Sequence, residues 1–254
     1  MSPLRLLSPA LFALAIVTAP PVASAQTFSE GQRDAIESII KNYLITHPEV
    51  LEDAMAELNK RQAAAEAEKH EASVTENAQA IFNSPRNVTL GNKNGDVTFV
   101  EFFDYNCGYC KRAMADMLDL LKTDPKLKVV LKEFPVLSQG SVEAAKVAVA
   151  VRMQDSGAKY LDFHQRLLGG RGPADKARAL AAAKDAGLDM ARIEKDMAGP
   201  EARATIEENF KLAESMGMNG TPSYVIGKQV IVGAIGLDGL KEKIALARCG
   251  KATC

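Results

Sequence analysis

Residues 102–112 have the sequence FFDYNCGYCKR, and they join a predicted strand to a predicted helix. The strand is an apolar run from Val97 to Phe103, which is typical of a buried β-strand. The helix runs from Cys110 to Thr123, where apolar residues recur at helical spacing. The cysteines Cys107 and Cys110 therefore lie at a strand-to-helix turn.

This position predicts redox chemistry. A thiolate at a helix N-terminus faces unpaired backbone N–H groups and the positive end of the helix dipole, so we expect a lowered pKa at Cys107. Cys110 lies about one turn further on and can attack a mixed disulfide formed at Cys107. The alternatives are half of a zinc site and a buried disulfide without chemistry. A zinc site requires a second Cys/His pair at finger or ribbon spacing, which the sequence lacks.

The N-terminus has the pattern of a secretory signal peptide. Arg5 precedes an apolar core from Leu11 to Val17, and Ala23-Ser24-Ala25 follows as a small-x-small cleavage site. The core is too short to span a bilayer, although an uncleaved anchor helix is the alternative. We expect residues 1–25 to be removed after Ala25 and the mature protein to be periplasmic.

Export makes the cysteine count informative. The 254 residues include four cysteines in two close pairs, Cys107/Cys110 and Cys249/Cys254, which suggest two local disulfides in an oxidising compartment, although four cysteines permit three pairings. For Cys249 and Cys254 we favour a local structural disulfide, with a secondary redox relay or a metal clamp as alternatives. The chain without Arg5 carries 30 basic and 32 acidic residues, and no basic stripe. Nucleic acid is therefore not expected as a partner.

Residues 26–84 differ in character from residues 85–254. Residues 27–84 carry 5 basic and 11 acidic residues, and two amphipathic helices are expected, the first from about Ser29, with Gln32 as a capping-box partner, to about Leu44. These helices are too small for a core of their own, so their apolar faces must pack on the second domain or on copies of themselves. Residues 59–77 are polar and rich in Ala, Glu and Lys, which predicts a semi-rigid helical linker. The apolar faces consist of Ile36, Ile39, Ile40 and Tyr43, and of Val50, Leu51, Met55 and Leu58.

The second domain is predicted to be α/β. A strand, a helix and a further apolar strand favour a parallel pairing, and a block without strand signals, at about 137–217, predicts helices. The first expected strand, Val88–Leu90, forms a hairpin with Val97–Phe103 through Asn94-Gly95, and Leu127–Phe134 is the third strand. The last two strands, Ser223–Ile226 and Gln229–Val232, form a hairpin through Gly227-Lys228. A helix from Leu237 to Ala247 ends the predicted domain.

This order of elements resembles the thioredoxin fold with the helical insertion of the DsbA-like family. Gly220-Thr221-Pro222 precedes a strand, where the family has a cis-proline loop facing the two cysteines. The resemblance implies substrate contacts at this loop and at the residues between the cysteines, namely Thr221, Pro222, Gly108 and Tyr109. It also implies a redox-active cysteine pair with no separate cofactor and no metal.

Glu101 is the only charged residue within the apolar strand before the motif. The resemblance places it where the family keeps a buried acid that moves a proton to or from the second cysteine. Burial would raise its pKa and suit it to that task. The alternative is an exposed carboxylate on an edge strand.

Nearly all of the mature chain is similar to periplasmic proteins of the ScsC type, in which the region from Tyr43 to Leu51 resembles an oligomerisation segment. Gly108-Tyr109 stands where strongly oxidising DsbA proteins have Pro-His, which predicts a less stabilised thiolate and a less oxidising disulfide. Gly-Tyr, and a Thr before the proline, are also what isomerases such as DsbC carry.

We therefore expect an isomerase or reductase of wrong disulfides in exported proteins. The resemblance implies a homo-oligomer, a dimer or trimer, formed through residues 27–84, and a membrane thiol reductase of the DsbD or ScsB type as partner. The alternatives are a monomeric dithiol oxidase, a Cu(I)-binding copper-tolerance protein and a holdase chaperone.

Overall fold

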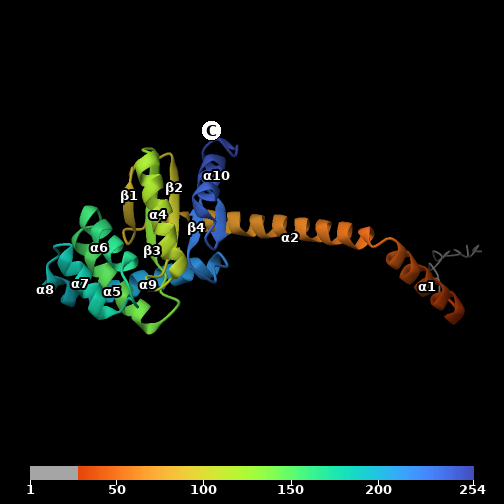
Figure 1. Ribbon diagram of the computed structural model, residues 1–254, viewed down its shortest axis with the longest axis horizontal. Helices are drawn as coiled ribbons and strands as arrows, with labels where there is room; N and C mark the ends of the chain where they lie inside the picture. Colours follow the sequence, from red (N-terminus) through yellow and green to blue (C-terminus); the bar gives the residue numbers. More distant parts are fainter. Residues whose placement is uncertain (1–27) are drawn as a thin grey trace, which may run out of the picture. The chain divides into compact units, whose positions relative to one another are not determined.

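The structure is a computed structural model that describes residues 28–254 (Figure 1). The predicted signal peptide, residues 1–25, lies outside these residues. Backbone contacts divide the chain into two units with a boundary between Leu58 and Asn59, inside helix α2 (Glu49–Glu76). No helix in the described residues is both long and apolar enough to span a membrane.

The first unit contains α1 (Glu30–Thr46) and the beginning of α2. The Ser29 backbone N–H donates to Gln32 Oε1 at 2.9 Å, so the predicted partner of this helix start is confirmed. No residue of α1 is buried. The predicted apolar faces are exposed to solvent within the unit, including Ile39 at 67% and Met55 at 58%.

The second unit is built on a five-stranded sheet with the order β1-β3-β2-β4-β5. The predicted parallel pairing is confirmed, since β2 and β3 run parallel with Val97 opposite Leu127. The hairpin of Gly227 is also confirmed, because β4 and β5 pair antiparallel and Gly227 has φ of 59°. The strands are β1 (Val88–Gly91), β2 (Val97–Phe103), β3 (Leu127–Glu133), β4 (Ser223–Ile226) and β5 (Gln229–Val232).

The predicted hairpin between the first two strands is wrong. β1 pairs antiparallel with β3, and β3 lies between β1 and β2. The turn at Asn94-Gly95 crosses the start of β3, where Asn92 N–H donates to Leu127 O at 2.9 Å and Asp96 N–H to Lys126 O at 3.0 Å. A Cβ on Gly95 would meet Lys126 O at 2.5 Å, so this crossing needs glycine.

Helices cover the sheet and form the predicted insertion. Figure 1 shows α4 lying along the strands, with α5 to α8 gathered beside one end of it. The helices of this unit, besides the end of α2, are α3 (Ala78–Phe82), α4 (Gly108–Thr123), α5 (Gln139–Gln154), α6 (Ala158–Gly169), α7 (Lys176–Asp185), α8 (Met190–Met197), α9 (Pro200–Ser215) and α10 (Gly236–Cys249).

The sheet has an apolar core on each face, which explains why β2 is almost continuously apolar. Phe99 and Phe103 pack in the core that includes Cys107, Cys110 and the insertion helices. The other core contains Phe102, together with residues from the end of α2 and from α3.

Part of the polar linker region belongs to this second core. Val74 and Ile81 are 2% and 0% exposed, and Ser73 Oγ donates to Ser215 O at 2.8 Å. The Lys132 ammonium reaches across and donates to Ala80 O at 3.0 Å. Residues 73–84 therefore help to cover the sheet that carries the two cysteines, while the division of the chain near residue 85 stays a prediction.

Candidate active site

Cys107 is the N-cap of α4. Its backbone is extended, with φ of −80° and ψ of 117°, and its sulfur accepts a hydrogen bond from the Cys110 backbone N–H at 3.3 Å. The strand before it and the helix after it both belong to the core, so the sulfur is held at the helix N-terminus, where the dipole stabilises negative charge. Both cysteines are free thiols in the structure.

The loop before β4 lies against Cys107. The Thr221–Pro222 peptide bond is cis, and the Cys107 sulfur lies 3.1 Å from Thr221 O, to which its protonated form donates. The sheet register brings these segments together, because β4 pairs antiparallel with β2 and Phe102 lies opposite Ser223. Thr221 Oγ1 is buried and has no hydrogen-bond partner among the described residues.

The two thiols differ in acidity. The pKa of Cys107 is lowered to about 5, chiefly by the hydrogen bond from the Cys110 thiol, against the opposing effect of burial. The backbone N–H groups of Cys110 and Tyr109 lower it further. Burial raises the pKa of Cys110, which is 0% exposed, and the bond it gives to Cys107 raises it further. Only Cys107 is therefore a thiolate at neutral pH.

Glu101 lies on the central strand β2 and is 3% exposed, so it is not on an edge. Residues alternate between faces along a strand, so Glu101 shares a face with Phe99 and Phe103, in the core that contains both cysteines. Its pKa is raised to about 8, first by burial and then by the negative charges of Cys107 and Asp116. Glu101 is consequently a neutral carboxylic acid at neutral pH.

A second buried polar group, which the sequence analysis missed, lies behind the motif. Tyr105 and Tyr160 donate to Glu133 Oε1 at 3.4 and 2.8 Å, and Tyr105 Oη lies 3.3 Å from His164 Nδ1. Burial raises the pKa of Glu133 to about 8 and lowers that of His164 to about 3, so both side chains are neutral. These residues are far apart in the sequence. The only signal was Glu133, an acid that ends an apolar strand.

The residues between β2 and Cys107 are fixed by hydrogen bonds from their own side chains. Asp104 accepts from the backbone N–H groups of Asn106 and Leu137 at 2.8 and 2.9 Å. Asn106 exchanges two hydrogen bonds with the backbone of Ala174, at 2.8 and 2.7 Å. The loop that carries the reactive cysteine is therefore tied to the helical insertion.

The residues between the cysteines face outward. Tyr109 is 60% exposed, and the Arg112 guanidinium lies 4.3 Å from the centre of its ring. A Cβ on Gly108 would meet no atom within 4 Å, so its surroundings are open. Both positions are accessible to a partner that approaches Cys107.

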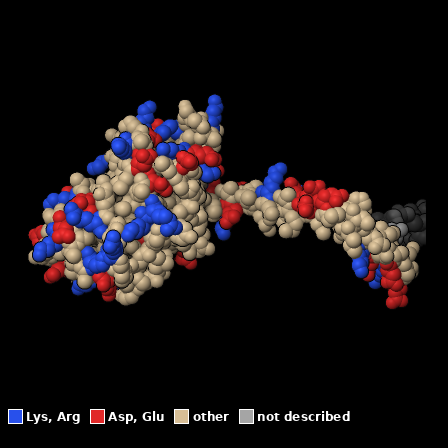
Figure 2. Space-filling view, in the orientation of Figure 1, with Lys and Arg blue, Asp and Glu red and all other residues tan. Residues whose placement is uncertain are grey.

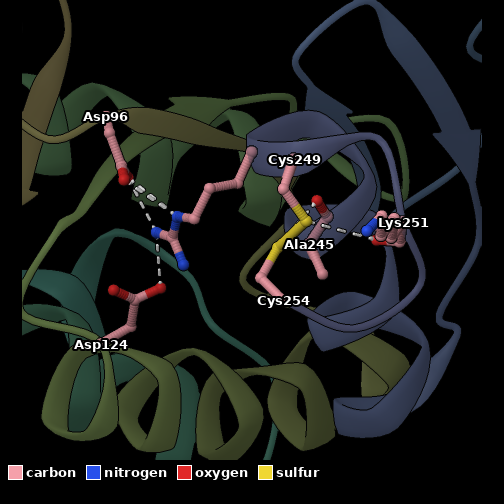
Figure 3. Close-up of a disulfide and its surroundings, with 7 residues drawn as sticks. Asp96, Asp124, Ala245, Cys249, Lys251 and Cys254 are labelled. Carbon is pink, nitrogen blue, oxygen red and sulfur yellow. Dashed lines mark hydrogen bonds and ion pairs between the residues drawn. A yellow bond between two sulfur atoms is a disulfide. The ribbon is translucent and has the colours of Figure 1, made fainter.

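Cys249 and Cys254 form a disulfide at the other end of α4 (Figure 3). Arg248, next to Cys249, donates to Asp96 and to Asp124, the C-cap of α4, at 2.8 Å each. The 16 residues of α4 span about 24 Å, so the structure does not bring this disulfide to Cys107. The described residues contain no group of three His, Cys, Asp or Glu side chains that could hold a metal ion.

Comparison with known proteins agrees with this geometry. The model of the DSBA-like thioredoxin domain matches residues 98–245, which is more than half of the chain. The chain belongs to the DSBA-like thioredoxin domain family. The N-terminal domain of the copper resistance protein ScsC matches residues 32–65. The predicted thioredoxin fold, DsbA-like insertion and N-terminal helical segment are therefore confirmed.

Solved structures give the same fold. A thioredoxin-like oxidoreductase from Silicibacter pomeroyi is 42% identical, with a TM-score of 0.64 over 67% of this chain and 96% of that one. The thiol-disulfide exchange protein alpha-DsbA2 from Wolbachia pipientis is 30% identical, with a TM-score of 0.66 over 71% and 96%. The catalytic domain of Proteus mirabilis ScsC is 26% identical, with a TM-score of 0.64 over 70% and 98%.

Curated relatives are longer than this chain. The Na(+)/H(+) antiporter NhaA 1 of Salinispora arenicola is 26% identical over 65% of this chain and 25% of its own length. The chain thus spans about a quarter of the length of the curated relatives it matches. The family assignment supports a thiol:disulfide oxidoreductase that uses a redox-active cysteine pair without a separate cofactor.

The acidity of Cys107 can be tested directly. We expect the ultraviolet absorbance of its thiolate to titrate with a pKa of about 5 in the reduced protein. In Cys110→Ala this pKa should rise, because the largest stabilising contribution is the hydrogen bond from the Cys110 thiol. An unchanged pKa in Cys110→Ala, or a wild-type value near that of free cysteine, would contradict this account.

The buried Glu101 carboxyl group should make the stability of the folded protein depend on pH. Its folded pKa of about 8 exceeds the unfolded value, so the folded state keeps a proton that the unfolded state loses, and its contribution to stability should decrease from about pH 4.5 to about pH 8. Glu101→Gln should therefore be more stable than the wild type by roughly 2 kcal/mol or more at pH 8, and by much less at pH 5. Denaturant unfolding at both pH values checks this, and a difference that is independent of pH would refute it.

Proposed function

We propose that the protein is a periplasmic thiol:disulfide oxidoreductase that reduces or rearranges wrong disulfides in exported proteins. The observation that carries this proposal is the unequal pair of thiols, an acidic Cys107 at a helix N-terminus and a buried, weakly acidic Cys110. A solved relative from Salmonella enterica, 30% identical, is described as a periplasmic thioredoxin-like protein, which agrees with the expected export.

The reaction begins at Cys107. Its thiolate attacks one sulfur of the substrate disulfide, a Cys107–substrate disulfide forms, and the other substrate sulfur leaves as a thiolate that takes up a proton. In isomerisation, a substrate thiolate then attacks within the substrate and releases Cys107 with no net change in electrons. In reduction, Cys110 loses its proton and attacks the Cys107 sulfur. The Cys107–Cys110 disulfide forms and the substrate leaves with two electrons and two protons gained.

Glu101 is proposed to take the proton of Cys110 once the mixed disulfide has formed. The Cys107 thiolate is one of the charges that raise the pKa of Glu101, so its loss in the mixed disulfide favours the ionised carboxylate that can accept a proton. Cys110 must lose its proton to attack, yet its burial opposes the negative charge. Glu101 has a pKa of about 8, close to neutral pH, and its charge is one of the influences that raise the pKa of Cys110, after burial and the hydrogen bond to Cys107. An acid with this pKa can alternate between its two forms as the reaction proceeds.

Substrate peptides are proposed to bind across Cys107. The loop of Thr221 and Pro222 is in contact with the reactive sulfur, and Gly108 and Tyr109 lie open beside it. Neither the Cys107 thiolate nor a mixed disulfide has an Sγ–H that could donate to Thr221 O. That carbonyl is therefore available to a substrate N–H group.

The acidity of Cys107 favours a Cys107–Cys110 disulfide of intermediate oxidising strength. A pKa of about 5 lies between the values of roughly 3.5 for DsbA and roughly 7 for thioredoxin. A more acidic thiol stabilises the reduced protein and makes its disulfide more oxidising, so an intermediate value suits reversible exchange. We propose that a membrane thiol reductase of the DsbD or ScsB type returns the Cys107–Cys110 disulfide to the dithiol.

The first unit is proposed to assemble the protein into a dimer or trimer. Its apolar side chains are exposed in the single chain, and the region matches the ScsC N-terminal domain. Exposed apolar side chains at helical spacing gain free energy when copies pack together. Assembly would set several Cys107 thiols around one substrate.

Assembly and isomerisation are tested together with the full mature chain. Ile39→Lys with Leu51→Lys places charges on the apolar faces, at side chains that are 67% and 51% exposed, so the catalytic unit should stay folded. We expect a monomer that reduces insulin disulfides normally but has lost most of its ability to reactivate ribonuclease with scrambled disulfides. Ser38→Lys, on the opposite side of α1, is the control and should behave as the wild type.

A different set of results would support the alternative function, a monomeric dithiol oxidase. If the wild type is monomeric, fails to reactivate scrambled ribonuclease, and oxidises reduced ribonuclease instead, the protein is a dithiol oxidase. In that case the two lysine substitutions should change nothing.

A further inference from the structure

A pocket of about 560 Å³ opens beside Cys107, on the side of the helical insertion. One wall is the loop between α6 and α7, residues 170–173, and the opposite wall is the motif itself. The apolar lining comes from Leu167, Leu168 and Pro173. A group bound here would lie next to a substrate cysteine joined to Cys107.

Hydrogen bonds from three side chains hold the loop of residues 170–173 and the residue after it in place. Asn106 exchanges two hydrogen bonds with the Ala174 backbone, as described above, and the Lys111 ammonium donates to Gly170 O at 2.7 Å. The Arg178 guanidinium donates to Gly172 O from behind. The loop is therefore tied to the motif, to α4 and to α7, and its shape is set before a ligand arrives.

The pocket is positively charged. Lys111 and Arg171 are among its lining residues, whereas the described residues that line it include no Asp or Glu. Lys111 is already engaged with Gly170 O, but Arg171 has no hydrogen-bond or ion-pair partner in the described part of the chain. Figure 2 shows a band of Lys and Arg side chains across the viewed face of the second unit.

We infer that this pocket binds a carboxylate side chain of the substrate peptide, next to the cysteine that reacts with Cys107, and that Arg171 recognises it. The inference rests on the proposed function and adds a substrate preference to it. A free guanidinium binds a carboxylate through two parallel hydrogen bonds. Neighbouring residues of an extended peptide are about 3.5 Å apart, and Cys107 itself lines the pocket, so a residue adjacent to the reacting cysteine is within reach of it.

The test compares two peptide disulfides that differ only by Glu or Gln beside the cysteine. The reduced protein reacts with each in a single turnover, forming the Cys107–Cys110 disulfide and two peptide thiols. The measured quantity is the ratio of the Glu rate to the Gln rate for each variant. This ratio cancels any change that a substitution makes in the acidity of Cys107 itself.

We expect Arg171→Gln to lower the ratio by about two- to fivefold, the effect of one partly exposed ion pair. Lys176→Gln, which removes a charge just outside the pocket, should leave the ratio unchanged, and high salt should reduce the wild-type ratio. Equal ratios in the wild type and Arg171→Gln would overturn the inference while leaving the proposed function intact. Failure of the wild type to reduce either peptide would instead overturn the proposed function.

A small disulfide that bears carboxylates could bind in the same way as the peptide. The second pair of substrates is therefore oxidised glutathione and oxidised glutathione with esterified carboxylates. If Arg171→Gln changes the preference only within this pair, and not between the peptides, the pocket recognises a free carboxylate-bearing thiol and the peptide assignment is wrong.

Discussion

The structure depends on one electrostatic constraint, the placement of two sulfurs at the first turn of α4. Cys107, the N-cap, accepts the backbone N–H of Cys110 and meets the positive end of the helix, and its pKa falls to about 5. Cys110, one turn further on, is in the apolar core, where burial opposes its ionisation. One thiol is therefore prepared to attack and the other is kept protonated until a mixed disulfide forms.

The surrounding fold keeps this arrangement rigid. The parallel pairing of β2 and β3 places the motif at one end of the sheet, and β4 brings the cis-proline loop to the same end. Behind the motif, the Tyr105 hydroxyl donates a hydrogen bond to Glu133. A neutral carboxylic acid therefore holds the loop before Cys107 in place without adding a charge. The helical insertion is joined to the loop through Asn106 and Ala174, and both walls beside Cys107 are thereby fixed.

The sequence predicted the local features well, because each depends on neighbouring residues. The strand-turn-helix around Cys107, the parallel crossover and the hairpin at Gly227 all follow from periodicity and turn chemistry. The first hairpin was predicted wrongly, because Asn94-Gly95 signals a turn but does not say which strand lies beside it. The buried position of Val74 and the partners of Glu133 depend on residues far away in the chain, which periodicity does not report.

Trapping of the mixed disulfide tests the division of labour between the two sulfurs most directly. Reduced Cys110→Ala and Cys107→Ala variants are incubated with a protein that has a non-native disulfide, then quenched with acid and analysed by mass spectrometry. The account predicts that Cys110→Ala accumulates a covalent complex through Cys107, and that Cys107→Ala forms almost none. Equal trapping by the two variants, or a complex formed through Cys110 alone, would contradict it.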